Sequence, residues 1–263
     1  MVRNYLQEKL IQGIQRDGPI RLDHFIEHVL YTPKYGYYQQ NAPSMQGQDF
    51  ITAPELGVEF VNALDDWLRP TLQREQINKI IEIGPGSGAL AKALGHIWKD
   101  ELQDYFFLEK STGLQNAQKK LCQSTTYQWI DQIKSFDSPV LILGNEYLDA
   151  LAARRFKMNN QQCQEALIGY DHDFYWHYQN QSYSLDGYVP SESAMDIIDL
   201  KPVFQLLDPI KCGLVVFIDY GYHFSEYQAL PYKQDSLRGF YRNQVIKLPW
   251  EHIGQMDLTV DVN

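Results

Sequence analysis

A loop with three glycines near residue 85 could bring a nucleotide close to the protein backbone. Residues 82–88 read Glu-Ile-Gly-Pro-Gly-Ser-Gly, so Gly84, Gly86 and Gly88 occupy alternate positions between an apolar run and a helical pattern. Glycine allows a ligand to approach closely, and the start of the following helix adds partial positive charge. A tight turn that binds nothing would account for the same residues. The spacing therefore predicts a nucleotide site, with a simple turn as the alternative.

The glycine spacing fits two kinds of nucleotide. Gly84, Gly86 and Ala89 also satisfy the G-x-G-x-x-G/A fingerprint, which would make the chain a nicotinamide-dependent oxidoreductase. Glu82 would repel a pyrophosphate, whereas its carboxylate can reach the ammonium group of S-adenosylmethionine or organise the loop. Pro85 removes a backbone N–H that a pyrophosphate would need. These two residues favour S-adenosylmethionine as the ligand.

Three further residues at the ends of expected strands could contact a nucleoside. Glu109 lies 21 residues beyond Gly88, where an acid can accept both ribose hydroxyls, although a solvated carboxylate is the plain alternative. Trp129 or Ile130 could flank an adenine ring, and core packing explains Trp129 equally well. NAD and S-adenosylmethionine share this nucleoside, so these residues do not distinguish between them.

Polar residues also follow the fourth expected strand. Asn145, Glu146 and Asp149 fall within five residues directly after an apolar run. Open α/β sheets bind ligands at the carboxyl ends of their strands, so this position indicates a reaction site. Capping of the following helix by Asn145 is the alternative.

The elements that must position these residues follow from the hydrophobic pattern. Alternating apolar runs and helical patterns predict a mostly parallel sheet with covered faces. Strands are expected at 79–83, 105–108, 126–130, 140–143 and 214–218, with helices at 89–98 and 113–122. Polar-alternating runs at 155–158, 165–169 and 174–178 predict an antiparallel β insertion, followed by a helix near 194–207. Earlier in the chain, helices are expected at 5–15, after a possible Asp23 cap, and at 54–68.

The predicted fold class is therefore α/β, with a helical N-terminal extension over residues 1–75 and a main domain over residues 76–263. The insertion occupies about residues 152–210 of the main domain. The chain has 263 residues, of which 44% are hydrophobic and 21% are charged, as in a protein with a full core.

Charge and composition exclude several classes of partner. A net charge of −10 argues against nucleic acid and favours a basic partner or a cationic group. No apolar run of about 18 residues and no signal peptide are found, which predicts a cytoplasmic protein without a membrane span. The three cysteines are far apart and form no C-x-x-C pair, so no metal site is expected.

Six motifs in this order resemble the MidA family, whose mitochondrial members are complex I assembly methyltransferases that act on protein arginine. The motifs span nearly the whole chain and lie at residues 31–38, 49–55, 82–88, 145–151, 219–221 and 257–259. The resemblance implies a class I methyltransferase (Rossmann-like) fold, S-adenosylmethionine as cofactor, and a protein arginine, such as one in a respiratory complex subunit, as acceptor. Family members continue beyond the last motif, so the sheet is expected to lack its last strands.

A guanidinium acceptor would need carboxylates, because it arrives positively charged and must lose a proton as the new bond forms. Glu146 and Asp149 are the candidates for this clamp. Asn145 would position the acceptor by hydrogen bonding. Asp219, after the fifth strand, is the reserve candidate for the clamp. Methyl transfer itself requires no metal.

Residues 49–55 are expected to cover the donor as a lid. Asp49 and Thr52 are the candidates for contacts with the cofactor, together with Phe50 and Glu55. A turn that leads into the next helix, capped by Asp49 or Thr52, is the alternative. At the level of function, a non-catalytic assembly or scaffold protein with a donor-type pocket remains the alternative to an enzyme. The sequence predicts no oligomeric state.

Overall fold

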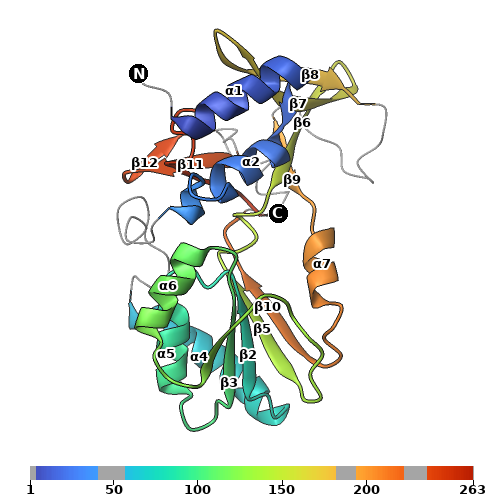
Figure 1. The fold of residues 1–263 in the computed structure, drawn as a ribbon. Coiled ribbons are helices and arrows are strands. Elements are labelled where there is room, and N and C mark those ends of the chain that lie inside the picture. The colour runs from blue at the N-terminus through green and yellow to red at the C-terminus, as the bar shows by residue number, and fades with distance from the viewer. Residues whose placement is uncertain (1–3, 41–56, 182–193, 222–235, 263) are drawn as a thin grey trace. The chain divides into compact units, whose positions relative to one another are not determined.

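The computed structural model describes residues 4–40, 57–181, 194–221 and 236–262, which form the coloured ribbon of Figure 1. Contacts between residues divide the chain into two units. Unit 1 contains residues 1–40, 149–199 and 220–263, and unit 2 contains residues 41–148 and 200–219. Each unit thus combines segments that are far apart in the sequence. The predicted domain boundary after residue 75 and the predicted insertion at 152–210 stay predictions.

Unit 2 is built on a parallel sheet with the strand order β10-β5-β2-β3-β4. Its strands are β2 (Lys79–Ile83), β3 (Asp104–Leu108), β4 (Tyr127–Ile130), β5 (Val140–Asn145) and β10 (Gly213–Ile218). The chain moves outward from β2 to β4 and then returns to the other side of β2 with β5. The direction of winding therefore reverses between β2 and β5, where open α/β sheets bind their ligands.

Helices cover both faces of this sheet (Figure 1). They are α4 (Val58–Arg74), α5 (Ala89–Ile97), α6 (Thr112–Leu121) and α7 (Lys201–Leu207). Leu68 of α4 and Leu94 of α5 belong to one buried cluster with Phe107 of β3. Leu206 of α7 packs against a second cluster that contains Ile83. The two clusters confirm the predicted α/β class, with helices on either side of a parallel sheet.

Unit 1 contains the antiparallel strands that the polar alternation predicts. Its larger sheet has the order β1-β7-β6-β9, with β8 also paired to β7. These strands are β1 (Ile20–Arg21), β6 (Ala153–Asn159), β7 (Gln162–Asp171), β8 (Asp173–Asn180) and β9 (Met195–Ile198). The helices α1 (Tyr5–Asp17) and α2 (Leu22–Tyr31) contact β7, so the predicted N-terminal helices pack on the predicted insertion. A short 3-10 helix, η1 (Tyr37–Gln39), follows α2.

A second, three-stranded sheet of unit 1 joins two of the family motifs. Its strands are β11 (Leu237–Tyr241), β12 (Gln244–Ile246) and β13 (Asp257–Val260), in the order β12-β11-β13. The hydroxyl of Tyr38 donates to the carboxylate of Asp257 at 2.7 Å, and Asp257 is buried. The motifs at 31–38 and 257–259 thus meet within unit 1 through a hydrogen bond that spans 219 residues of sequence.

Three of the predicted elements need correction. The expected helix at 194–207 is instead the strand β9 followed by α7, because pairing with β6 and a buried Arg155–Asp196 ion pair hold residues 195–198 in an extended form. Asp23 does not cap α2; its carboxylate binds Arg21 and the backbone N–H of His24. The helix expected at 54–68 begins at Val58 in the described residues and continues to Arg74.

Across the described ranges, none of the helices combines the length and the apolar composition that crossing a bilayer requires.

Candidate functional site

The parallel sheet of unit 2 brings most of the predicted site residues to one edge. Ile83 of β2 is in register with Leu108 of β3, which is in register with Ile130 of β4. On the other side of the sheet, Ile218 of β10 pairs with Asn145 of β5. The pairing of β2 with β5 joins these two halves, so all five strands end near one edge, where Ile130 and Asn145 are the last residues of β4 and β5. Gly84, Glu109 and Asp219 directly follow β2, β3 and β10 at the same edge.

The three glycines of the loop all have left-handed backbone angles, but for different reasons. Their φ angles are +64° at Gly84, +54° at Gly86 and +84° at Gly88. A Cβ atom at Gly84 would lie 2.8 Å from the ring of Tyr147, and one at Gly88 would lie 3.2 Å from Cγ of Gln118. A Cβ at Gly86 would meet none of the described residues within 4 Å. Of the three loop glycines, Gly86 is thus the one with open space beside it in the described part of the chain, and it is where a ligand could contact the backbone.

Glu109 is held in place by groups on helix α6. Its Oε1 accepts the backbone N–H of Ser111 at 2.7 Å, and its Oε2 accepts Nε2 of Gln118 at 3.3 Å. Ser111 also caps α6, since its hydroxyl accepts the N–H of Leu114. Burial raises the pKa of Glu109 to about 7, against the lowering effect of these hydrogen bonds. The carboxylate is thus oriented at the strand end before any ligand binds.

Glu82 is more deeply buried than a residue that contacts the ammonium group of the cofactor would need to be. It is 2% exposed, and the hydroxyl of Tyr105 donates to its Oε2 at 2.7 Å. Burial raises its pKa to about 8, and the nearby charge of Glu109 contributes to the same shift. A neutral Glu82 at pH 7 is the consequence. The bond to Tyr105 holds Glu82 within the sheet. Its two predicted roles, contact with the donor and organisation of the loop, stay predictions.

Trp129 and Ile130 lie on opposite faces of the sheet, as neighbours in a strand do. Trp129 stacks on Phe107 with a centroid distance of 5.0 Å, and its indole N–H donates to Oε1 of Gln118 at 2.9 Å. Ile130 packs against the buried cluster on the other face, which contains Ile81 and Ile83. Both residues therefore take part in packing, and their contact with an adenine ring stays a prediction.

Asn145 and Glu146, at the end of β5, combine a buried amide oxygen with a strained backbone angle. Oδ1 of Asn145 is buried and, among the described residues, has no hydrogen-bond donor within reach, although Nδ2 donates to Oε1 of Glu146 at 3.2 Å. Glu146 has φ +50°, a strained angle for a residue with a side chain, and its N–H donates to the carbonyl of Ile218. An unsatisfied buried acceptor and backbone strain both occur often at functional sites.

The remaining acidic candidates are distributed between the two units. Asp219 belongs to unit 2, where its Oδ2 accepts the N–H of Leu148 at 2.7 Å. Asp149 belongs to unit 1, where its carbonyl accepts the N–H of Val260. Asp219 therefore orders the turn after β5, and its reserve role in catalysis stays a prediction, as does the role of Asp149. Asp49 and Thr52 lie outside the described residues.

Two residues of the site were not identified from the sequence. Gln118 is fully buried on α6 and links the glycine loop to Glu109 and Trp129. Tyr147 packs on Gly84 and stacks on Phe217; burial raises its pKa, and the charge of Glu109 adds to the shift. Gln118 falls on the same helical stripe as Leu114, so its polar side chain at a core position was the available signal. Tyr147 gave no comparable signal.

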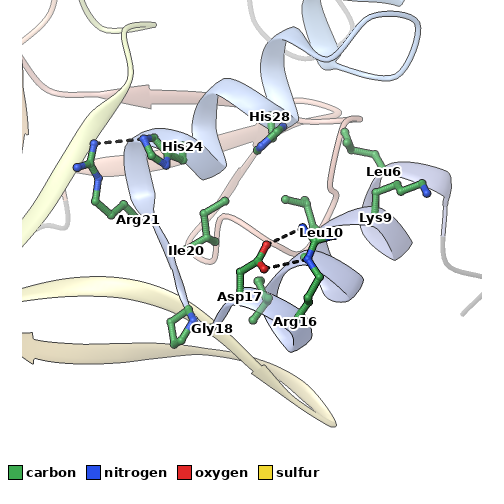
Figure 2. Close-up of a pocket in the computed structure, with 13 residues that line it drawn as sticks. Leu6, Lys9, Leu10, Arg16, Asp17, Gly18, Ile20, Arg21, His24 and His28 are labelled. Atoms are coloured by element: carbon green, nitrogen blue, oxygen red, sulfur yellow. Dashed lines mark hydrogen bonds and ion pairs between the residues drawn. The ribbon is translucent and has the colours of Figure 1, made fainter.

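A separate cavity of about 480 Å³ lies in unit 1, between α1, β1 and α2. Figure 2 shows Arg16 bonded to Asp17, and Arg21 next to His24. Arg21 is also bonded to Asp23. None of the predicted site residues lines this cavity, and its two arginines already have acidic partners. The cavity is therefore separate from the strand-end site.

Solved structures share this fold along the whole chain. A member of the COG1565 superfamily from Burkholderia thailandensis, solved with bound S-adenosyl-homocysteine, is 24% identical with a TM-score of 0.84. The match covers 100% of this chain and 76% of that one. A native structure of a COG1565 superfamily protein from the same organism is 23% identical with a TM-score of 0.82, and covers 100% and 75% of the two chains. These similarities confirm the predicted methyltransferase-type fold.

Curated relatives match over nearly the full length of this chain. The Caenorhabditis elegans protein named "Protein arginine methyltransferase NDUFAF7 homolog, mitochondrial" is 25% identical over 99% of this chain and 70% of its own length. The Drosophila melanogaster protein of the same name is 25% identical over 98% of this chain and 68% of its own length. Both are named as mitochondrial proteins, so the prediction of a cytoplasmic location is wrong. The prediction rested on the absence of a long apolar run and of a signal peptide, and such absences do not identify a compartment.

The family itself is established by a family model. The model Methyltransf_28, which describes S-adenosyl-L-methionine-dependent methyltransferases, matches residues 56–263. The match includes the glycine loop and every strand of the parallel sheet. S-adenosylmethionine is therefore the cofactor, and the nicotinamide-dependent alternative is set aside. The chain belongs to the Methyltransf_28 family of S-adenosyl-L-methionine-dependent methyltransferases, in agreement with its resemblance to MidA.

Proposed function

We propose that this methyltransferase modifies an arginine side chain of another protein. The observation that carries the proposal is the pair of acceptors after β5. Asn145 has a buried Oδ1 without a donor among the described residues, and Glu146 places a carboxylate beside it. A guanidinium has five N–H donors and no acceptor, so it is complementary to such a pair. The curated relatives are named protein arginine methyltransferases, which supports the same acceptor.

The loop after β2 suits the cofactor that the family uses. Gly86 leaves its backbone open on one side, and Glu109 is an oriented acid at the end of the adjacent strand. We expect Gly86 to allow close approach of the cofactor and Glu109 to accept hydrogen bonds from its ribose hydroxyls. When bound, S-adenosylmethionine would supply a methyl group on a positively charged sulfur: the bond from the acceptor nitrogen to the methyl carbon forms as the carbon–sulfur bond breaks, and the sulfur leaves as the neutral thioether of S-adenosylhomocysteine.

Glu146 and Asn145 would act on the acceptor. Oδ1 of Asn145 would accept one N–H of the guanidinium and so fix the direction of the attacking nitrogen. The carboxylate of Glu146 would hold the positive charge and accept the proton that the nitrogen loses as its bond to the methyl carbon forms. The strained backbone of Glu146 would keep the carboxylate in this place. Asp149 and Asp219 remain secondary candidates for the same proton.

Transfer of labelled methyl groups tests the proposal. Purified protein and methyl-labelled S-adenosylmethionine are incubated with candidate proteins, and the modified residue is identified by mass spectrometry. The resemblance to MidA makes subunits of respiratory complex I the first proteins to test. Label on arginine is the expected result. Label on another residue would overturn the choice of acceptor, and cofactor binding without transfer to any protein would instead favour the scaffold alternative.

Glu146→Gln should lower the rate of methyl transfer by about 10²-fold or more, the usual scale for losing a positioned acid or base. The substitution keeps the shape of the side chain and removes its charge. Cofactor affinity should stay within about threefold, because no cofactor contact is lost and only the transition state is affected. Calorimetry and initial rates measure the two effects separately.

Glu75→Gln provides the matched control, since Glu75 follows α4 and is exposed. Its transfer rate should equal that of the unmodified protein. A Glu146→Gln variant that loses cofactor affinity yet transfers methyl groups at the normal rate would make Glu146 a cofactor residue, and the acceptor clamp would then have to include Asp149 or Asp219.

A further inference from the structure

Gln118 is a fully buried carboxamide in the middle of α6. Burying a polar side chain costs free energy unless its donors and acceptors find partners. Leu114, one turn earlier on the same helix, is the apolar residue that such a stripe normally carries. An amide at this position therefore needs a reason beyond packing.

The partners of Gln118 determine which way its amide points. The indole N–H of Trp129 lies 2.9 Å from Oε1 of Gln118. An indole N–H can only donate, so the atom that faces it must be the amide oxygen. The NH₂ group then faces the other way, toward two acceptors. Nε2 lies 2.8 Å from the carbonyl oxygen of Gly86 and 3.3 Å from Oε2 of Glu109.

The close approach of α6 to the loop depends on Gly88. A Cβ atom there would lie 3.2 Å from Cγ and 3.6 Å from Cβ of Gln118. Glycine at this position thus leaves room for the stem of Gln118, while the amide reaches past it to Gly86. One side chain thereby connects the loop after β2, the carboxylate after β3 and the indole of β4.

We propose that Gln118 is a positioning residue for S-adenosylmethionine, which fixes the Gly86 carbonyl and the Glu109 carboxylate relative to each other before the cofactor binds. The inference rests on cofactor binding at this strand edge and is independent of the methyl acceptor. Fixing two binding groups in advance lowers the entropy lost on binding. Loss of Gln118 should therefore weaken cofactor binding even though Gln118 itself need not contact the cofactor.

Gln118→Glu is the sharpest single test. It keeps the size of the side chain and the acceptor for Trp129, but replaces the NH₂ donor with an oxygen that faces the Gly86 carbonyl and the Glu109 carboxylate. Calorimetry with S-adenosylmethionine should show at least a tenfold higher Kd. The matched control is Gln123→Glu, because Gln123 is exposed and its amide donates to the nearby carbonyl of Lys120. Its Kd should stay within about twofold. An unchanged Kd in a folded Gln118→Glu variant would overturn the proposal.

Gln118→Met adds a test without a new charge. The hydrogen bond from Gln118 is one of the contacts that lower the pKa of Glu109, against the raising effect of burial. The other titratable groups near Glu109 are Glu82 on β2 and Tyr147 after β5. Ionised Glu109 is the form that should bind ribose hydroxyls, so cofactor affinity should rise with pH through a midpoint near the pKa of Glu109. In Gln118→Met this midpoint should move to higher pH; a midpoint that does not move would count against positioning of Glu109.

A double-mutant cycle separates positioning from general loss of structure. The effects of Gln118→Met and Glu109→Ala on cofactor Kd should be clearly less than additive, because removing Glu109 removes one of the groups that Gln118 positions. Fully additive effects would overturn the proposal. The indole N–H resonance of Trp129 reports the local structure in each variant, and it can be assigned with Trp129→Phe. If Gln118→Glu does not fold, the methionine variant carries both the pH test and the cycle.

Discussion

Two carboxylates, the buried Glu82 and the partly buried Glu109, distinguish the strand-end site of unit 2 from an ordinary sheet edge. Glu109 accepts hydrogen bonds from Ser111 and Gln118 at the edge itself. Glu82 is one strand away, in the core, and accepts a hydrogen bond from Tyr105. Burial raises both pKa values, to about 7 for Glu109 and about 8 for Glu82. Small changes of local environment can therefore change the charge at this site near neutral pH.

The raised pKa of Glu82 predicts a pH-dependent stability. The group binds its proton in the folded protein up to a pH of about 8, but releases it near its ordinary value of 4.5 when unfolded. Between these values the folded state binds more protons, so the free energy of unfolding should fall as pH rises from about 4.5 to about 8. Glu82→Gln cannot ionise and can still accept the bond from Tyr105, so it should remove this part of the pH dependence.

Urea unfolding at several pH values measures the effect of Glu82→Gln. The variant should match the unmodified protein near pH 4.5 and be the more stable of the two near pH 8. Parallel pH profiles for the two proteins would contradict the assignment of a raised pKa to Glu82.

At the scale of secondary-structure elements, the glycine loop packs directly against helix α6. Gly84 makes room for Tyr147 and Gly88 makes room for Gln118, whereas no described residue would lie within 4 Å of a Cβ at Gly86. The regular spacing of three glycines thus combines two packing requirements with one position open to a ligand. Tertiary contacts also determine local structure in unit 1. There the buried Arg155–Asp196 ion pair, together with the hydrogen bond from Ser236 to Asp196, explains why residues 195–198 form a strand.

Gly86→Val should abolish measurable cofactor binding while unit 2 stays folded. The branched side chain would occupy the space that is open at Gly86, and its φ of +54° would be strained for valine. Gly18→Val is the matched control, because Gly18 also has a positive φ, of +90°, and a Cβ there would also meet none of the described residues within 4 Å. Circular dichroism and calorimetry should show some loss of stability in both variants, but loss of binding only in Gly86→Val. Global unfolding of Gly86→Val alone would favour a structural turn.

For the molecule as a whole, the net negative charge is the property most relevant to a protein substrate. The net charge of −10 creates a field that attracts cationic chains. With a basic arginine-containing peptide as acceptor, KM should rise with salt, while kcat stays nearly constant, because screening weakens the encounter and not the chemical step. Initial rates between about 0.02 and 0.2 M NaCl would measure this. A KM that does not respond to salt would place recognition in short-range contacts alone.

The sequence by itself determined the parallel sheet, the helices α4, α5 and α6 that pack on it, and the antiparallel strands β6, β7 and β8 of unit 1. These elements are defined by local hydrophobic period, which residues 79–83 or 174–178 carry in their own side chains. The sequence also placed Glu109, Asn145 and Asp219 at strand ends, since parallel strands end at a common edge. The family followed from motifs that are read without any structure.

Only the tertiary structure decided which partners the site residues have. It placed Gln118 between Gly86, Glu109 and Trp129, and left Oδ1 of Asn145 without a donor in the described part of the chain. It also made the first part of the helix expected near 194–207 the strand β9. Each outcome depends on contacts between residues far apart in the sequence, such as the 41 residues that separate Arg155 from Asp196. Local propensity differs between conformations by less than about 1 kcal/mol per residue, so such long-range contacts determine the result.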